Sequence, residues 1–210
     1  MTPLALALLL AAAVLAVVDW GAVGRDDLRT EKRARLAVGA ALIASAAVLD
    51  PQSQAQRAAF LVALLLSLAR DLLVPGGERR FRFAVAASLA AHVAYVVGFQ
   101  QVGWSWLWAA AGIVVVLVAT LGFAVRLVLG VRASAPGLTL PVVLYIVVLS
   151  VMVVAASATG QPTAVAGAFL FYCADALAGW NRYREPTPYA RVTIAAAYHL
   201  AQILLVVSLT

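Results

Sequence analysis

The chain has 210 residues, of which 65% are hydrophobic and 11% charged, and its formal net charge is +6. Soluble domains average about 45–50% apolar and about 25% charged residues, so this composition excludes an ordinary soluble protein and indicates a polytopic membrane protein. The apolar segments are rich in Ala, Leu and Val and lack the alternation of a membrane β-barrel. We therefore predict an all-α fold.

The positive charge does not indicate nucleic acid binding, because the basic residues lie in short loops and no basic and aromatic patch accompanies them. Cys173 is a single cysteine, which excludes an internal disulfide and a cysteine-rich metal site.

Eight apolar segments are separated by charged, proline or glycine residues, and we predict a bundle of eight transmembrane helices. In chain order the expected helices cover residues 4–18, 36–49, 58–74, 83–99, 107–125, 140–157, 164–180 and 192–209. The first has no basic segment before it and no suitable cleavage site, so we expect a membrane helix and not a removed signal. It should end at an interfacial pair, Asp19-Trp20. The second is short, and either tilts little or begins inside the preceding basic stretch.

Helix breaks are predicted at Pro75-Gly76-Gly77, Pro136-Gly137 and Gly160-Gln161-Pro162. Trp104, with two further tryptophans close behind it in the sequence, is expected to form an aromatic belt at the membrane interface.

Nearly all of the 15 basic residues fall in the odd-numbered loops of this scheme, and the exceptions are Arg57 and Arg70. The positive-inside rule therefore places the odd-numbered loops in the cytoplasm and both termini on the opposite side of what we expect to be a bacterial plasma membrane.

The whole chain, residues 1–210, is expected to form a single integral membrane domain. Residues 68–73 resemble residues 172–177, and residues 90–95 resemble residues 196–201. This weak echo suggests two parallel four-helix repeats, residues 1–103 and 104–210.

Asp71 and Asp175 place carboxylates inside apolar helices, where ionisable groups are costly and mark functional sites by default. Two carboxyls close together in one cavity would provide a proton donor and a base. The alternative is that each pairs with a neighbouring Arg or Tyr and only fixes helix packing. Arg70 directly precedes Asp71, so we expect the two side chains on different helix faces, with Arg70 either extending to the interface or taking part in catalysis.

His92 and Tyr95 share a helix face at i, i+3, and Tyr198 and Gln202 share one at i, i+4. They are candidates for a proton relay, for positioning water or for binding a polar head group, and the alternative is hydrogen bonding between helices. His199 lies on another face from Tyr198 and is expected to be structural.

Tyr145 follows Pro141 by one turn and is expected to reach the same cavity from a kinked helix. A catalytic zinc site usually needs three protein ligands, and the chain has two histidines and no His-Glu-x-x-His motif. Ser67 and Ser88 lack a nucleophile elbow, and no glycine-rich phosphate loop is present. We therefore predict neither a metal nor a cofactor.

Six successive segments resemble the motifs of the YhhN-type lysoplasmalogenases. They are Ser67-Leu68-Ala69-x-Asp71, His92-x-x-Tyr95, Pro141-x-x-x-Tyr145 with Met152, Gly167-Ala168-x-Leu170-Phe171-x-x-x-Asp175, Asn181-Arg182-Tyr183 and Tyr198-x-x-Ala201-Gln202. Proteins of this family are eight-helix membrane enzymes that hydrolyse the vinyl ether bond of lysoplasmalogens to a fatty aldehyde and a glycerophospho-base. Arg70 stands where the family usually has glycine, and Ala174 stands where serine is usual.

The resemblance implies a hydrolase in which Asp71 and Asp175 form the acid/base pair, with His92 beside them. The residues implied to support catalysis, orient water or bind the polar head are Tyr95, Tyr145, Asn181, Arg182, Tyr198 and Gln202. The implied partners are a lysolipid substrate and membrane lipids, with no nucleic acid. If Arg70 holds Asp71 ionised, the alternative is a divergent family member that binds or moves a lysolipid-like amphiphile. A metal-dependent lipid amidase or hydrolase is a third interpretation.

Overall fold

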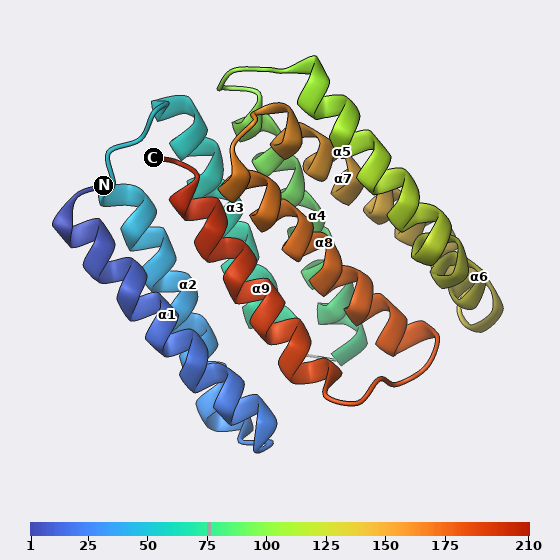
Figure 1. The fold of residues 1–210 in the computed structure, drawn as a ribbon. Helices are drawn as coiled ribbons and strands as arrows, with labels where there is room; N and C mark the ends of the chain where they lie inside the picture. Colours follow the sequence, from blue (N-terminus) through green and yellow to red (C-terminus); the bar gives the residue numbers. More distant parts are fainter. Residues whose placement is uncertain (75–76) are drawn as a thin grey trace.

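The computed structural model describes residues 1–74 and 77–210, and within them the protein is all helical, without any strand (Figure 1). The helices are α1 (Pro3–Gly24), α2 (Leu28–Val48), α3 (Gln54–Leu73), α4 (Gly77–Phe99), α5 (Trp106–Ala119), α6 (Val125–Ser134), α7 (Thr139–Ala158), α8 (Pro162–Tyr183) and α9 (Ala190–Val207). A π-helical turn, η2 (Thr120–Ala124), joins α5 and α6 into one continuous rod, and a 3₁₀ turn, η3 (Pro136–Leu138), precedes α7.

Among the described residues, six helical segments are long and apolar enough to cross a membrane. They are α1, most of α4, the rod of α5 and α6, the segment from η3 through α7, α8 and α9. The predicted all-α integral membrane fold is therefore confirmed. The helices α2 and α3 have 21 and 20 residues and are not among these six segments, so the count of eight spans stays a prediction.

The fifth predicted helix was expected to end at residue 125, but the rod of α5, η2 and α6 continues to Ser134, so Arg126 and Arg132 are helical and not in a loop.

The first two helices also differ from their predicted bounds. The helix α1 continues to Gly24, and Asp19 is completely buried inside the bundle, so the prediction of an interfacial Asp19-Trp20 pair was wrong. The reason is that Asp19 faces Arg35 on the next helix, 3.3 Å away, instead of the membrane surface. The helix α2 begins inside the basic stretch, as one of the two alternatives proposed, because Asp27 caps it by accepting from the Thr30 N–H at 3.1 Å.

The later breaks lie where the sequence predicts them. The helix α7 ends before Gly160, which has a φ of +69°, a conformation that favours glycine, and Pro162 begins α8. Pro136 begins the 3₁₀ turn before α7. The break predicted at Pro75 and Gly76 lies outside the described residues.

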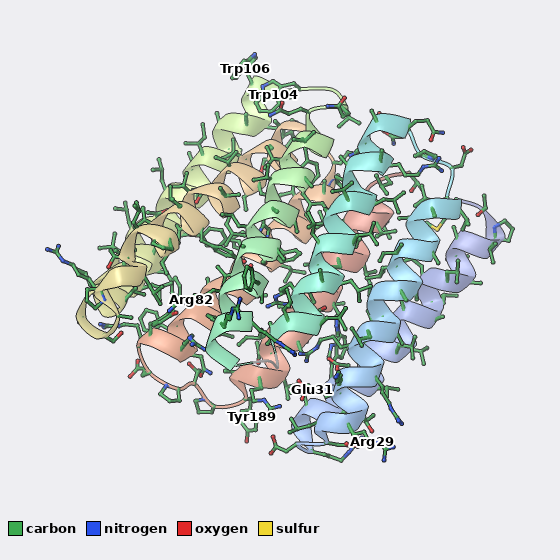
Figure 2. The ribbon with its side chains drawn as sticks, turned by 180° about the vertical axis from the view of Figure 1, so that it is seen from behind. Arg29, Glu31, Arg82, Trp104, Trp106 and Tyr189 are labelled. Atoms are coloured by element: carbon green, nitrogen blue, oxygen red, sulfur yellow. The ribbon has the colours of Figure 1, made fainter. Side chains whose placement is uncertain are left out.

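The polypeptide ends meet at one end of the bundle, and the loops after α1 and α8 lie at the other end (Figure 1). Figure 2 shows Trp104 and Trp106 at the first end and Arg29, Glu31, Arg82 and Tyr189 at the second. The helices α1 and α2, α3 and α4, and α8 and α9 form close pairs, and α9 also packs on α1 while α4 and α8 pack on α7. This arrangement brings α3, α4, α7, α8 and α9 together around the residues that the sequence singles out.

Candidate active site

Arg70 joins the two aspartates that the sequence predicts as a pair. Its Nη1 donates to Asp71 Oδ1 at 3.1 Å, and its Nη2 lies 4.0 Å from Asp175 Oδ1. The side chains of Asp71 and Asp175 are 5% and 7% exposed, and that of Arg70 is 19% exposed. Each charge is therefore compensated by an opposite charge inside an apolar bundle, which limits the cost of burying it.

The expectation that Arg70 and Asp71 point to different faces of α3 was wrong for their charged groups. Adjacent helical residues do start on different faces, but the long stem of arginine lets the guanidinium reach the neighbouring carboxylate. The guanidinium also lies over the ring of Tyr198, 4.6 Å from its centre. Arg70 thus belongs to the cluster and does not extend to the membrane interface.

Asp175 accepts a short hydrogen bond from α7. The Tyr145 hydroxyl donates to Asp175 Oδ2 at 2.6 Å and lies 2.7 Å from Ser88 Oγ. His92, which is fully buried on α4, places its Nε2 3.5 Å from the same carboxylate oxygen. The carboxylate of Asp175 is therefore held by a hydrogen bond from α7, with Arg70 on α3 and His92 on α4 as close neighbours.

Asp71 is held by a different helix. The Tyr198 hydroxyl on α9 donates to Asp71 Oδ2 at 3.0 Å, so each aspartate accepts from one tyrosine. The ring of Phe171 contacts both halves of the cluster, since it packs nearly at right angles against His92 and against Tyr198. These contacts fix the rotation of α4 and α9 about their axes.

The centre borders an apolar cavity of about 790 Å³. Its wall is formed mostly by aliphatic and aromatic side chains of α4, α6, α7 and α8, and the polar and charged residues in it are Arg70, Arg82, Ser88, Tyr145, Tyr172, Asp175, Asn181, Arg182 and Tyr183. Pockets of this size and character accommodate small-molecule ligands. Asp175 thus lines the cavity, whereas Asp71 is not among the lining residues that the structure describes.

Two predicted head-group residues lie at the end of α8. Asn181 lines the cavity and its Oδ1 accepts from the Thr187 N–H at 2.9 Å, so it also fixes the loop before α9. The Arg182 guanidinium lies 4.0 Å above the ring of Phe81 on α4. This contact places Arg182 beside the segment of α4 that carries Arg82.

The remaining predicted residues are buried but lie outside the cavity wall. Tyr95 packs edge-on against Phe60, and its hydroxyl has no hydrogen-bond partner among the described residues. Gln202 is buried one turn beyond Tyr198 on α9. His199 faces α1, where its Nδ1 accepts from the Trp20 indole N–H at 3.2 Å, as its expected structural role requires.

Sequence reasoning missed two features of the centre. The sequence suggests Ser88 only as a candidate nucleophile, yet its hydroxyl contacts Tyr145. Its position four residues before His92, on the same face of the helix as His92, is the signal that could have identified it. The position of Asp19 against Arg35 had no signal in the sequence, because it depends on the packing of two different helices. Among residues 1–74 and 77–210, no group of three His, Cys, Asp or Glu side chains is arranged to hold a metal ion.

The fold and this centre define a class: integral membrane helical bundles in which a buried carboxylate, arginine and tyrosine cluster borders an apolar cavity. The chain belongs to the YhhN family, whose family model matches residues 33–209. It is similar to the lysoplasmalogenase TMEM86B of Homo sapiens, with 32% identity over 124 residues, which are 59% of this chain and 51% of that protein. It is also similar to the lysoplasmalogenase TMEM86B of Sus scrofa, with 31% identity over 148 residues, 70% of this chain and 62% of that protein. The matched region thus spans about half to three fifths of these relatives, and no solved structure matches the chain.

Proposed function

We propose that the protein is a lysoplasmalogenase-like hydrolase that cleaves the vinyl ether bond of a lysolipid to a fatty aldehyde and a glycerophospho-base. The observation that carries the proposal is the position of Asp175, a buried carboxylate in the wall of an apolar cavity, oriented by Tyr145 and His92. The family membership and the names of the two relatives support the same reaction.

Vinyl ether hydrolysis begins with transfer of a proton to the alkenyl carbon that is not bonded to oxygen. The resulting oxocarbenium ion is captured by water at the oxygen-bearing carbon, and the proton that this water loses returns to the carboxylate. The hemiacetal then collapses to an aldehyde and an alcohol, so one water is consumed and the acid is regenerated. The chemistry requires a positioned acid and a group that guides water, and both can be supplied by side chains.

Asp175 is the aspartate that we assign as the acid. Tyr145 donates to Oδ2, and Arg70 is 4.0 Å from Oδ1, beyond hydrogen-bond distance, so we assign Oδ1 as the oxygen that carries the transferred proton. Asp71 has a different role, because it accepts hydrogen bonds from Arg70 and Tyr198 and is not among the described residues that line the cavity. We assign Asp71 to holding Arg70, and Arg70 to screening the negative charge that Asp175 carries after the proton has left.

We assign His92, which lies 3.5 Å from Asp175, to guiding water, with Tyr95 on α4 and Tyr198 and Gln202 on α9 as supporting residues. The phosphate of the substrate would meet Arg82 and Arg182, which line the cavity on neighbouring helices, while Asn181 shapes the same end. Because Figure 2 shows Arg82 at the end that bears Arg29, we infer that this end faces the cytoplasm of a bacterial plasma membrane and that substrate enters from that leaflet.

The test is aldehyde release by the purified full chain in detergent micelles from a vinyl-ether lysolipid, with the saturated alkyl-ether analogue as substrate control. We expect Asp175→Asn to lower kcat by about a hundredfold or more, the usual contribution of a general acid. The matched variant is Asp50→Asn, which removes an exposed carboxylate between α2 and α3 and should keep wild-type activity. Equal rates for Asp175→Asn and wild type, in protein with an unchanged melting temperature, would show that Asp175 is not the acid.

The second candidate function is binding or movement of a lysolipid-like amphiphile without hydrolysis. The contact of Arg70 with both carboxylates favours it, because a charge-paired aspartate is a poor proton donor. In that case the alkyl-ether and vinyl-ether lysolipids bind equally well, and neither is consumed by the wild-type protein.

A further inference from the structure

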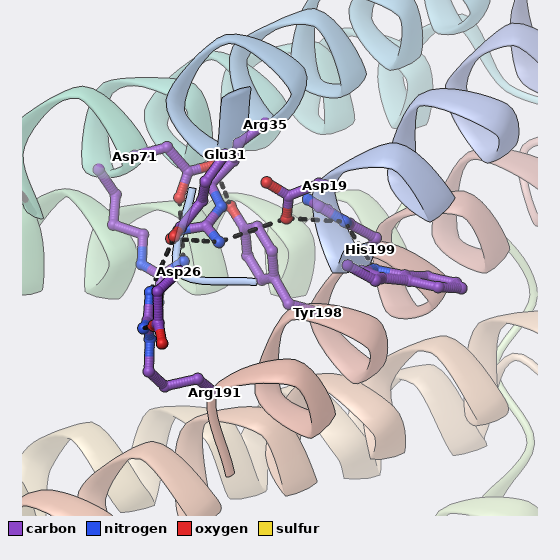
Figure 3. A network of polar contacts seen from close by, with 10 residues as sticks. Asp19, Asp26, Glu31, Arg35, Asp71, Arg191, Tyr198 and His199 are labelled. Atoms are coloured by element: carbon purple, nitrogen blue, oxygen red, sulfur yellow. Dashed lines mark hydrogen bonds and ion pairs between the residues drawn. The ribbon is translucent and has the colours of Figure 1, made fainter. Parts of the chain in front are cut away.

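A second buried polar cluster lies beside the centre, on α1, α2 and α9 (Figure 3). Asp19 on α1 has no exposed surface, and its Oδ2 accepts from Arg35 Nη2 at 3.3 Å. The same nitrogen lies 3.0 Å from Glu31 Oε1. Glu31 in turn accepts from Arg191 at 2.9 Å, and Arg191 also contacts Asp26 at the surface. Asp19 precedes the region that matches the family model, and the proposed reaction gives it no role.

Arg35 is the cation that balances Asp19. His199 lies 3.8 Å from the same carboxylate oxygen, but its Nδ1 accepts from the Trp20 N–H. A nitrogen that accepts carries no proton, so His199 offers Asp19 no positive charge through that atom. Asp19 Oδ1 has no hydrogen-bond partner among the described residues. A pair that served stability alone would satisfy both oxygens, because an unpartnered buried oxygen is costly.

Arg35 belongs to the same network of polar side chains as Asp71 (Figure 3). Both of its ion contacts use Nη2, and Figure 3 shows Arg35, Asp71 and Tyr198 in one group. A partly buried guanidinium that lost Asp19 would keep Glu31 as a partner and would be drawn toward the carboxylate of Asp71 in the same network. Asp71 would then be drawn from Arg70, which it contacts at 3.1 Å.

We propose that Asp19 is a positioning residue: it holds Arg35 on α1 so that Asp71 stays with Arg70 and Tyr198. The proposal rests on the proposed function for its effect on turnover, since Arg70 must remain between Asp71 and Asp175. It assigns a task to a buried charge that lies outside the cavity and touches no substrate. The acid itself, Asp175, is unchanged by the substitution, and so is the cavity wall.

The first test compares Asp19→Asn, Arg35→Gln and the double variant in the aldehyde assay. Asp19→Asn should lower kcat by about tenfold or more, as expected for one charge-assisted contact, and leave KM within about twofold. The double variant should regain most of the lost kcat, because no guanidinium is then left to compete for Asp71. A merely structural role of Asp19 predicts the reverse, a double variant at least as impaired as Asp19→Asn, and that result overturns the proposal.

The second test does not depend on hydrolysis. The loss of melting temperature caused by Asp71→Asn is measured in the wild-type, Asp19→Asn and Asp19→Asn/Arg35→Gln backgrounds. We expect a larger loss in the Asp19→Asn background, where Arg35 keeps Glu31 and turns to Asp71 in place of Asp19, and no excess loss once Arg35 is glutamine. Equal losses in all three backgrounds refute the proposal, because independent sites give additive effects. A wild-type protein that releases no aldehyde refutes the proposed function, while this stability comparison still decides the role of Asp19.

Discussion

Replacing Arg70 by glutamine removes the guanidinium that contacts both aspartates and leaves two buried carboxylates without their shared cation. The exposed fractions of the three side chains, 19%, 5% and 7%, mean that solvent screens their interactions only weakly. At an effective dielectric constant of about 20, charges 4 Å apart attract by about 4 kcal/mol, so even the longer contact to Asp175, at 4.0 Å, contributes to the cluster.

The net cost is smaller than the sum of these attractions, because each charge also regains some solvation when its partner is removed. Breaking a buried ion pair by removing one partner typically costs about 3–5 kcal/mol. In a protein of this length, 1 kcal/mol shifts the melting temperature by about 2–4 °C. Arg70→Gln should therefore lower the melting temperature by about 6–20 °C. The double variant Arg70→Gln/Asp71→Asn should recover part of this loss, since it removes an anion together with the cation.

The measurement is thermal unfolding of the purified variants in one detergent, followed by circular dichroism. Arg80→Gln is the matched control, because Arg80 is an exposed arginine near the start of α4 and does not line the cavity; it should melt within about 1 °C of wild type. If Arg70→Gln melts as high as Arg80→Gln, Arg70 extends to the membrane interface in solution and the bridging interpretation of the cluster is wrong.

Two comparisons test the roles within the cluster. Tyr145→Phe removes the donor at 2.6 Å from Asp175 and should lower kcat by about tenfold to a hundredfold, because a hydrogen bond to a charged group contributes about 1.5–3 kcal/mol. Tyr198→Phe removes the donor at 3.0 Å from Asp71 and should lower kcat less. The opposite order in steady-state aldehyde release contradicts the assignment of Asp175 as the acid. Arg82→Gln should raise KM several-fold for a phosphate-bearing vinyl-ether lysolipid but not for the phosphate-free 1-alkenylglycerol. Arg80→Gln is the control variant in the same assay. An equal rise in KM for both substrates excludes Arg82 from phosphate binding.

The all-helical membrane fold was accessible from the sequence because the length of an apolar run and the residues that interrupt it determine a membrane helix almost by themselves. The π-helical turn of Thr120–Ala124 was not accessible, because hydropathy does not register a local change in backbone hydrogen bonding. Asp19 shows a second limit. The sequence around Asp19 is the same whether its carboxylate lies at the membrane interface or pairs with Arg35 on the next helix, and only the packing of the helices distinguishes the two.

The residues of the centre were also accessible one by one, since a polar side chain in an apolar helix is conspicuous. Their pairing was not, because it depends on how each helix is rotated about its axis. Tyr145 was expected to reach the cavity and does, but nothing in the sequence connected it to Asp175 instead of Asp71. Likewise Arg70 had several interpretations, and the length of its stem, not its position on the helical wheel, decides which carboxylates it reaches.

The contacts of the two aspartates give a physical reason why one of them should be the acid. His92 and Tyr198 occupy matching positions in the echoed segments 90–95 and 196–201, and each contacts the aspartate of the opposite half: His92 lies 3.5 Å from Asp175, and Tyr198 donates to Asp71. A two-fold relation between the predicted repeats would produce this exchange of partners. The relation fails at Arg70, whose counterpart is Ala174, and at Tyr145. The two aspartates therefore occupy matching positions in the repeats but have different neighbours. Arg70 is closer to Asp71 than to Asp175, and the carboxylate with the weaker ion contact lines the cavity. In this interpretation the arginine that replaces the usual glycine leaves Asp175 as the proton donor and changes Asp71 into its support.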